Sequence, residues 1–174
     1  MDFYIRPSRP EDAAEVAAIR VMPGVMENIF SIPSEQAAQM KEYYRNLGPN
    51  QHEFTAVLRK EDGQEQVIGA AGLSVGNGRG RHCSEIGMMV HPQYQNQKVG
   101  RALMEALLDL ADNWLMLIRI ELSVFTDNAA AIHLYEKFGF QKEGVKRMAG
   151  VRAGKYEDLC IMGRIRPGSS AEDV

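Results

Sequence analysis

The sequence predicts a mixed α/β (α+β) domain with a mostly antiparallel, twisted central sheet of about seven strands and helices on both faces. Three observations support this class. Apolar residues alternate with a period of two in some segments and recur every three or four residues in others. These segments follow the order strand, two helices, three strands, helix, strand, helix and closing strands, and one strand-helix-strand stretch has the length of a parallel crossover.

The length of the chain limits the number of domains. The chain has 174 residues, which is enough for one domain with a substantial core and too short for two domains of ordinary size. We therefore expect a single domain over residues 1–167, followed by a flexible C-terminal tail at 168–174.

The N-terminal part of the chain predicts one strand and two helices. Residues 2–6 are typical of a short strand, and Ser8 with Glu11 fits a capping box that begins a helix over residues 13–19. Residues 34–47 carry apolar side chains at helical spacing and end at Gly-Pro. Both helices therefore lie between the first and second strands.

Three strands follow. Residues 53–59 and 65–74 flank Asp62-Gly63, a pair that tolerates the positive φ of a hairpin turn. Residues 83–90 alternate, with Ile86, Met88 and Val90 on one face and Glu85, Gly87 and Met89 on the other. We expect these strands to pair antiparallel.

The second half of the chain predicts a crossover and a closing helix. Residues 99–114 form an amphipathic helix with one buried stripe, made of Val99, Leu103, Leu107, Leu110 and Trp114. Residues 119–125 alternate as a strand, so strands 83–90 and 119–125 should be parallel neighbours. Asn128 then caps a helix that ends at Gly139, and residues 156–165 form a last strand.

Composition excludes several classes of function. The formal net charge of −3 argues against a general electrostatic hold on nucleic acid or on an anionic membrane. Cys83 and Cys160 lack the spacing of a disulfide framework or a zinc site, so we expect reduced thiols and no metal. No export signal or membrane span is visible, and we expect a cytoplasmic protein.

The stretch HPQYQNQKVGRALM, residues 91–104, joins an apolar strand to an amphipathic helix. A helix start offers unpaired N–H donors and a partial positive charge, so the turn from Gln95 to Arg101 can wrap a phosphate or pyrophosphate. Gly100 lets the backbone approach a ligand closely. An ordinary turn solvated by water would fit the same pattern, so a second feature is needed to decide.

Two motifs supply that feature. HPQYQNQKVGRAL resembles the acyl-coenzyme A loop of the GNAT superfamily of N-acyltransferases, and DNAAAIHLYEKFGF resembles the next motif of the same superfamily, an Asn followed seven residues later by Tyr on a helix ending in Gly-Phe. The order of elements agrees over nearly the whole chain. Lys98 departs from the pattern, because the superfamily usually has glycine there. If that position needs a positive φ, lysine costs about 1 to 2 kcal/mol.

The resemblance implies acetyl-CoA as acyl donor and assigns residues to it. Main-chain groups of Met88, Met89 and Val90 would pair with the pantetheine arm, and Asn128 would contact it as well. The pyrophosphate would lie on the loop formed by Gln95, Asn96, Gln97, Lys98, Val99, Gly100 and Arg101. The Lys98 ammonium could approach the phosphates and recover some of its backbone cost.

The resemblance also implies transfer of an acetyl group to a primary amine by direct attack in a ternary complex. Tyr135 is the expected general acid and Glu85 the expected general base, acting directly or through water. A packing role for Tyr135 and a plain exposed carboxylate for Glu85 are the structural alternatives. Within the superfamily, RIELSVFTDN and KYEDLCIM resemble a bacterial L-amino acid N-acetyltransferase subgroup.

The leading acceptor is therefore a small molecule, a free L-amino acid or related amine. At pH 7 an α-amino group needs about 1.4 kcal/mol for deprotonation and a lysine side chain about 4.6 kcal/mol, which favours the former for a single carboxylate base. Met22, Asn28 and Phe30 would line the acceptor pocket. The alternatives are a protein N-terminus, a polyamine, an antibiotic amine, or a non-catalytic acyl-CoA sensor. The closing strands could also supply a homodimer interface.

Overall fold

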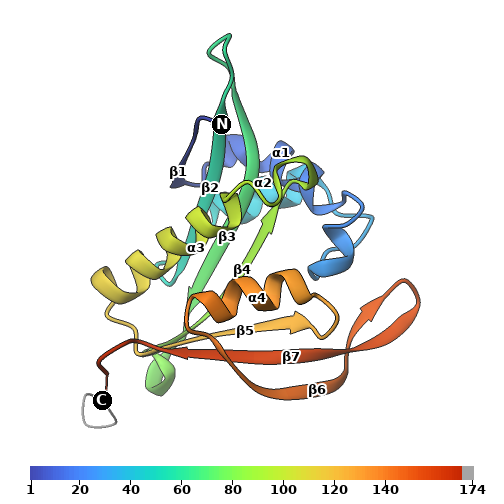
Figure 1. Ribbon diagram of the computed structural model, residues 1–174. Helices are drawn as coiled ribbons and strands as arrows, with labels where there is room; N and C mark the ends of the chain where they lie inside the picture. The colour runs from blue at the N-terminus through green and yellow to red at the C-terminus, as the bar shows by residue number, and fades with distance from the viewer. Residues whose placement is uncertain (170–174) are drawn as a thin grey trace. The chain divides into compact units, whose positions relative to one another are not determined.

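The computed structural model, drawn in Figure 1, describes residues 1–169. Its helices and longer strands confirm the mixed class and the order predicted from sequence. They are β1 (Phe3–Pro7), α1 (Ala13–Arg20), α2 (Ala37–Arg45), β2 (Gln51–Arg59), β3 (Glu65–Val75), β4 (Cys83–Val90), α3 (Val99–Asp109), β5 (Arg119–Phe125), α4 (Ala129–Lys137), β6 (Gln141–Arg152) and β7 (Lys155–Ile165). The strands pair in the order β1-β2-β3-β4-β5-β7-β6.

The chain divides into two compact units, each assembled from separate stretches of sequence. The first unit holds Met1–Leu73 and Gly87–Leu107, and the second holds Ser74–Ile86 with the described residues from Leu108 onward. The single domain over 1–167 stays a prediction. Most of the predicted tail at 168–174 lies outside the described residues.

The core of the first unit forms where α1 and α2 pack against strands β3 and β4. Its buried side chains are Ala13, Val16, Ile19, Val25, Tyr44, Val67, Ala70 and Met89. The start of α3 approaches a different site on β3, where a Cβ added to Gly69 would lie 3.2 Å from Leu103 and 2.9 Å from the Met89 carbonyl oxygen. Glycine is therefore required at this close approach.

The second unit places α4 through a buried ion pair. In this unit β5 pairs in parallel with β4, from Cys83–Arg119 to Glu85–Glu121, and antiparallel with β7. On β7, Arg164 binds Asp112 through two contacts of 2.9 and 2.7 Å and donates to the Phe138 carbonyl at 3.1 Å. The guanidinium thereby fixes the C-terminal end of α4, the helix that carries Tyr135.

The predicted continuous helix over 99–114 is wrong at its end. The α-helix stops at Asp109, and Leu110–Trp114 form a π-helical turn in which the Leu115 N–H donates to the Leu110 carbonyl at 2.9 Å. The wider turn shifts the buried stripe by one residue. Ala111 is buried, and Trp114, predicted to be buried, is 76% exposed.

The predicted capping box is also displaced by one residue. The carboxylate of Asp12, not Glu11, accepts the backbone N–H of Arg9 at 2.8 Å, and Ser8 instead hydrogen-bonds the Thr55 hydroxyl at 2.6 Å. Asp12 is 5% exposed and binds the Arg6 guanidinium through two contacts of 2.7 Å. A buried salt bridge with further hydrogen bonds requires an acid that can reach both partners, and only Asp12 does so.

The Asp12 pair predicts a pH-dependent stability. Burial alone would raise the pKa of Asp12, but hydrogen bonds from Arg6 and Arg9 lower it overall. This carboxylate therefore stabilises the fold above its unfolded pKa of about 3.9, and its contribution is lost as the pH falls through the lower folded value. Asp12→Ala should cost about 3 to 5 kcal/mol at pH 7, because it leaves Arg6 unpaired. Urea unfolding at pH 7 and pH 3 measures both effects.

The matched control is Asp2→Ala, which removes an exposed carboxylate. We expect it to change the free energy of unfolding by less than about 0.5 kcal/mol. Equal stability losses in the two variants would contradict the role of Asp12.

Candidate active site

The turn between β4 and α3 has left-handed backbone at two residues that are not glycine. Asn96 has φ 58° and Lys98 has φ 69°. Asparagine tolerates this region, whereas a lysine pays the full steric cost of its Cβ, about 1 to 2 kcal/mol. Position 98 therefore has the positive φ at which lysine, in place of the usual glycine, carries a backbone cost.

The same turn presents backbone N–H groups. The first intrahelical hydrogen bond of α3 runs from the Ala102 N–H to the Lys98 carbonyl at 3.0 Å. The N–H groups of Val99, Gly100 and Arg101 precede it, and none of them has a backbone acceptor within the described chain. These donors and the positive end of the helix dipole can bind an anion.

Two glutamine side chains hold this turn in shape. The Gln95 side chain donates to the Val90 carbonyl at 3.2 Å, and the Gln97 side chain donates to the Gln93 carbonyl at 2.7 Å. Both amides are directed back to the chain that precedes them, so these two residues act on the shape of the loop. Their direct contact with a cofactor stays a prediction.

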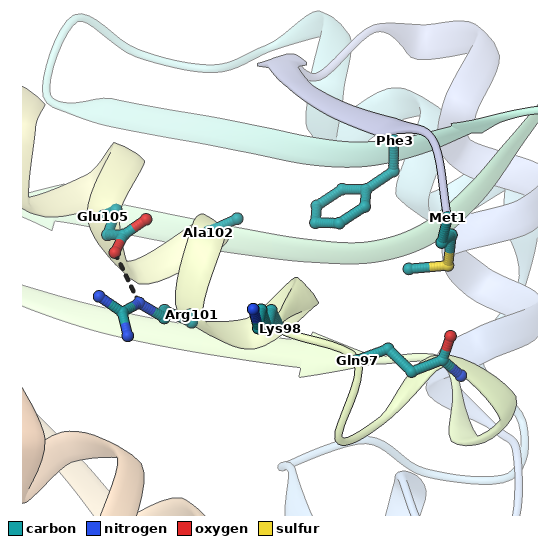
Figure 2. Close-up of a pocket in the computed structure, with 7 residues that line it drawn as sticks. All are labelled: Met1, Phe3, Gln97, Lys98, Arg101, Ala102 and Glu105. Carbon is teal, nitrogen blue, oxygen red and sulfur yellow. Dashed lines mark hydrogen bonds and ion pairs between the residues drawn. The ribbon is translucent and has the colours of Figure 1, made fainter.

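Two cations of this loop face a hollow beside the N-terminus. Figure 2 shows the residues that line it: Met1, Phe3, Gln97, Lys98, Arg101, Ala102 and Glu105. Arg101 Nε lies 2.8 Å from Glu105 Oε1, and both side chains are more than half exposed, so the pair is screened by water. The hollow includes neither Tyr135 nor Glu85, and it lies beside the loop that is predicted to bind the pyrophosphate.

The stretch Met88–Val90 can act through its main chain. The Met89 side chain is 8% exposed and belongs to the core, while Met88 and Val90 are half-buried. The ladder between β4 and β5 ends at Glu85–Glu121, and over the described strands β5 continues in register with β7 only. Main-chain groups of β4 beyond Glu85 are thus available to pair with an extended ligand.

Tyr135 is a buried phenol with a free hydroxyl. The residue is 8% exposed, its ring lies 5.9 Å from that of Phe140, and its hydroxyl has no hydrogen-bond partner among residues 1–169. Burial raises the pKa of Tyr135 to about 12. The phenol therefore stays protonated and can donate a hydrogen bond. An ordinary thiol has a pKa of about 8.5 and a free phenol a pKa of about 10. Because the pKa of Tyr135 is higher than that of a free phenol, full proton transfer from Tyr135 to a thiolate is less favourable than transfer from a free phenol.

Asn128 caps α4. Its side-chain oxygen accepts the Ala131 N–H at 3.2 Å, which satisfies one of the free donors at the helix start. This oxygen is therefore already engaged in a structural role. A contact of Asn128 with the pantetheine arm stays a prediction and would use the side-chain NH₂.

Glu85 is an exposed carboxylate on β4. It stands opposite Glu121 in the parallel register, and Glu121 binds Arg119 at 2.5 Å. Over the described residues Glu85 itself has no hydrogen bond or ion pair. The role of Glu85 as base stays a prediction.

The three predicted acceptor residues have local contacts. Met22 packs partly buried against the core of the first unit, and the Asn28 side chain donates to the Gly24 carbonyl at 2.9 Å. Phe30 is 62% exposed. Met22 and Asn28 thus shape the loop after α1, and acceptor binding by all three stays a prediction.

Sequence reasoning missed a polar cluster on the sheet of the first unit. Glu53 of β2 accepts the Tyr43 hydroxyl at 2.7 Å, and Arg20 lies close enough to lower the pKa of both groups. The available signal was the strand pattern. Glu53 lies on the same face of β2 as Thr55 and Val57, which are fully buried. An acidic residue on a buried face is unusual and indicates a site.

No group of three or more His, Cys, Asp or Glu side chains in residues 1–169 is arranged to hold a metal ion. None of the helices in that range has both the length and the apolar character needed to span a bilayer.

Comparisons with known proteins agree with this geometry. The model of the acetyltransferase (GNAT) family matches residues 25–140. The L-amino acid N-acetyltransferase AaaT of Escherichia coli K12 is 31% identical over 95% of this chain and 99% of its own length. A spermidine N(1)-acetyltransferase of Vibrio cholerae is 30% identical over 78% of this chain and 76% of its own length.

A solved structure shares the fold. The crystal structure of a GNAT-family acetyltransferase from Streptococcus pneumoniae superposes with a TM-score of 0.80 and 26% identity, covering 95% of this chain and 99% of that one. The predicted sheet, with its parallel β4–β5 pair, is therefore confirmed.

The backbone of Lys98 yields a stability prediction. Lys98→Gly removes a left-handed Cβ and adds freedom to the unfolded chain, so we expect a net gain of about 0.5 to 1 kcal/mol. The matched control is Lys60→Gly, an exposed lysine outside the set of left-handed residues, which should lose stability. Urea unfolding measures both variants, and a gain at Lys60 equal to that at Lys98 would contradict the account.

Proposed function

We propose that this chain, which belongs to the GNAT family and is an acetyl-CoA-dependent N-acetyltransferase, acetylates the amine of a free L-amino acid. The observation that supports a free L-amino acid as the acceptor is the similarity to an L-amino acid N-acetyltransferase over 95% of this chain and 99% of that protein. The spermidine relative matches a smaller part of the chain, which leaves a polyamine as the second candidate.

The residues of the first unit fit the donor. The amides of Val99, Gly100 and Arg101 lack backbone acceptors in the described structure and suit a pyrophosphate, and the Lys98 ammonium adds charge to the same loop. Main-chain groups of Met88–Val90 would pair with the pantetheine arm. Bound acetyl-CoA supplies an activated acyl group, whose carbonyl carbon the acceptor amine attacks.

Protons are then moved by two side chains. Glu85 takes the proton that the attacking amine loses as the C–N bond forms, directly or through water. The Tyr135 hydroxyl donates a hydrogen bond to the sulfur as the C–S bond breaks. Because its pKa is raised, the phenol keeps its proton until negative charge has developed on the sulfur. Both substrates are present together, so no acyl group is attached to the protein.

A homodimer is part of the proposal. Strand β6 is the last in the strand order, and of its residues Gly150 alone is buried. Val145, Met148 and Val151 on this strand are each more than half exposed. An edge strand with exposed apolar side chains favours pairing with a second copy. Light scattering of the purified protein measures its mass, and a monomer at all concentrations would contradict this part.

The function is tested by release of the free coenzyme A thiol from acetyl-CoA. L-amino acids, polyamines and peptides with a free N-terminus are screened as acceptors, beside a calorimetric titration of acetyl-CoA alone. We expect turnover with L-amino acids. Turnover confined to polyamines or peptides would contradict the proposed acceptor, and binding of acetyl-CoA without turnover on any amine would favour a sensor.

Tyr135→Phe tests the acid. The substitution keeps the packing and removes the hydroxyl, so we expect kcat to fall by about 10²- to 10⁴-fold with acetyl-CoA affinity unchanged. Tyr156→Phe, at a tyrosine that is 68% exposed, is the control and should retain full activity. Equal turnover in the two variants would remove Tyr135 from the mechanism.

A further inference from the structure

The carboxylate of Glu53 lies over the sheet of the first unit, beside Gly72 of β3. A Cβ added to Gly72 of the neighbouring strand would lie 2.4 Å from Glu53 Oε1, so the carboxylate occupies the space that a side chain at position 72 would take. The Tyr43 hydroxyl donates to the same oxygen at 2.7 Å. Burial raises the pKa of Glu53, although Tyr43 and Arg20 act in the opposite direction. The fold thus holds a desolvated acid whose only hydrogen-bond partner in residues 1–169 is a neutral hydroxyl.

The charge of Arg20 lowers the pKa of Glu53, yet Arg20 pairs with a different carboxylate. Arg20 Nε lies 2.8 Å from Glu35 Oε2, and the Ser31 hydroxyl holds the same carboxylate oxygen. No ion pair joins Arg20 to Glu53 in the described chain, and the terminal guanidinium nitrogens of Arg20 have no partner there. The Arg20 side chain is 26% exposed. The Arg20 guanidinium and the Glu53 carboxylate are therefore not paired with each other, and each can form further hydrogen bonds.

The space beside Glu53 is open toward β4. The His91 N–H donates to the Ile68 carbonyl at 2.9 Å, and counting along the antiparallel strands from this bond places Gly87 opposite Gly72. A Cβ on Gly87 would meet no atom within 4 Å. Gly87 directly precedes Met88, the first residue predicted to pair with the donor. The absence of a side chain at Gly87 thus leaves open space over the sheet between the Glu53 carboxylate and the Met88–Val90 segment.

We propose that Arg20 and Glu53 recognise the zwitterionic head of the acceptor amino acid. The terminal nitrogens of Arg20 bind its α-carboxylate, and the carboxylate of Glu53, together with the Tyr43 oxygen, receives its α-ammonium. Glu53 lacks a charged partner in the described chain, which is costly in a half-buried site, and Arg20 has terminal nitrogens beyond the Nε that binds Glu35, so a zwitterion can bind both groups at once. A polyamine would satisfy Glu53 alone and would be repelled by Arg20. Glu53 is a positioning residue here, which places the nitrogen that later loses its proton.

This inference rests on the proposed function, and its test separates the two. The variants are Arg20→Gln and Glu53→Gln, each with a control that makes the same change of charge at an exposed residue, Arg45→Gln and Glu61→Gln. Each L-amino acid is offered beside its α-amide, which lacks the carboxylate. The readouts are KM for the amine, KM for acetyl-CoA, kcat, and binding of the amino acid by saturation-transfer NMR.

The expected results differ between the two variants. Arg20→Gln should raise KM for L-amino acids by about tenfold or more and leave KM for the α-amides unchanged, because only the amino acids carry the carboxylate. Glu53→Gln should raise KM for both sets by about tenfold or more, because both carry the ammonium. KM for acetyl-CoA should stay constant, and the controls should match the wild type.

Two outcomes would overturn the inference. One is an unchanged KM for L-amino acids in both variants, with thermal melting showing that they are folded. The other is wild-type preference for α-amides or spermidine over L-amino acids. If the wild type acetylates no amine, the proposed function fails, and NMR binding still decides: zwitterion binding lost in both variants supports the inference, and no zwitterion binding by the wild type overturns it.

Discussion

The start of α3 is the constraint on which the account depends. A helix cannot satisfy its own first N–H groups, and the turn before α3 leaves those of Val99, Gly100 and Arg101 pointing away from any backbone acceptor in the described chain. Left-handed backbone at Asn96 and Lys98 produces this turn. Because main-chain groups would make the predicted site, its donors do not depend on the side chain at position 98, and a lysine there keeps them at a backbone cost of about 1 to 2 kcal/mol.

The acidic groups separate into different roles by their surroundings. Glu85 is exposed and has no hydrogen bond or ion pair in the described structure. Glu53 is enclosed by Gly72 and Tyr43 and electrostatically coupled to Arg20, so its environment suits a fixed cationic partner. Under the two proposals, the same chemical group would support proton transfer at one position and recognition at the other.

Local patterns in the sequence were sufficient for much of the fold. Period-two alternation located β4 and β5, and Asn128 and Gly139 marked the ends of α4, because these signals arise within a few neighbouring residues. Trp114 was misplaced because a π-helical turn inserts one residue into the helical period, which spacing alone does not reveal. The predicted acyl-donor loop and the predicted role of Tyr135 rest on sequence motifs.

The remaining site residues depend on contacts across the fold. The surroundings of Glu53 are formed by a tyrosine on α2 and a glycine on β3. Arg20 is held by a glutamate in the loop after α1. None of these pairs is adjacent in sequence, so no local pattern connects them. The structure was needed to bring them together as one cluster.

The central claim is transfer of an acetyl group to a free L-amino acid. The most direct test is a competition in one reaction, with limiting acetyl-CoA and equal concentrations of L-amino acids, spermidine and a peptide with a free N-terminus, analysed by mass spectrometry. We predict N-acetyl-L-amino acids as the main product. Acetylated spermidine or acetylated peptide as the main product would contradict it.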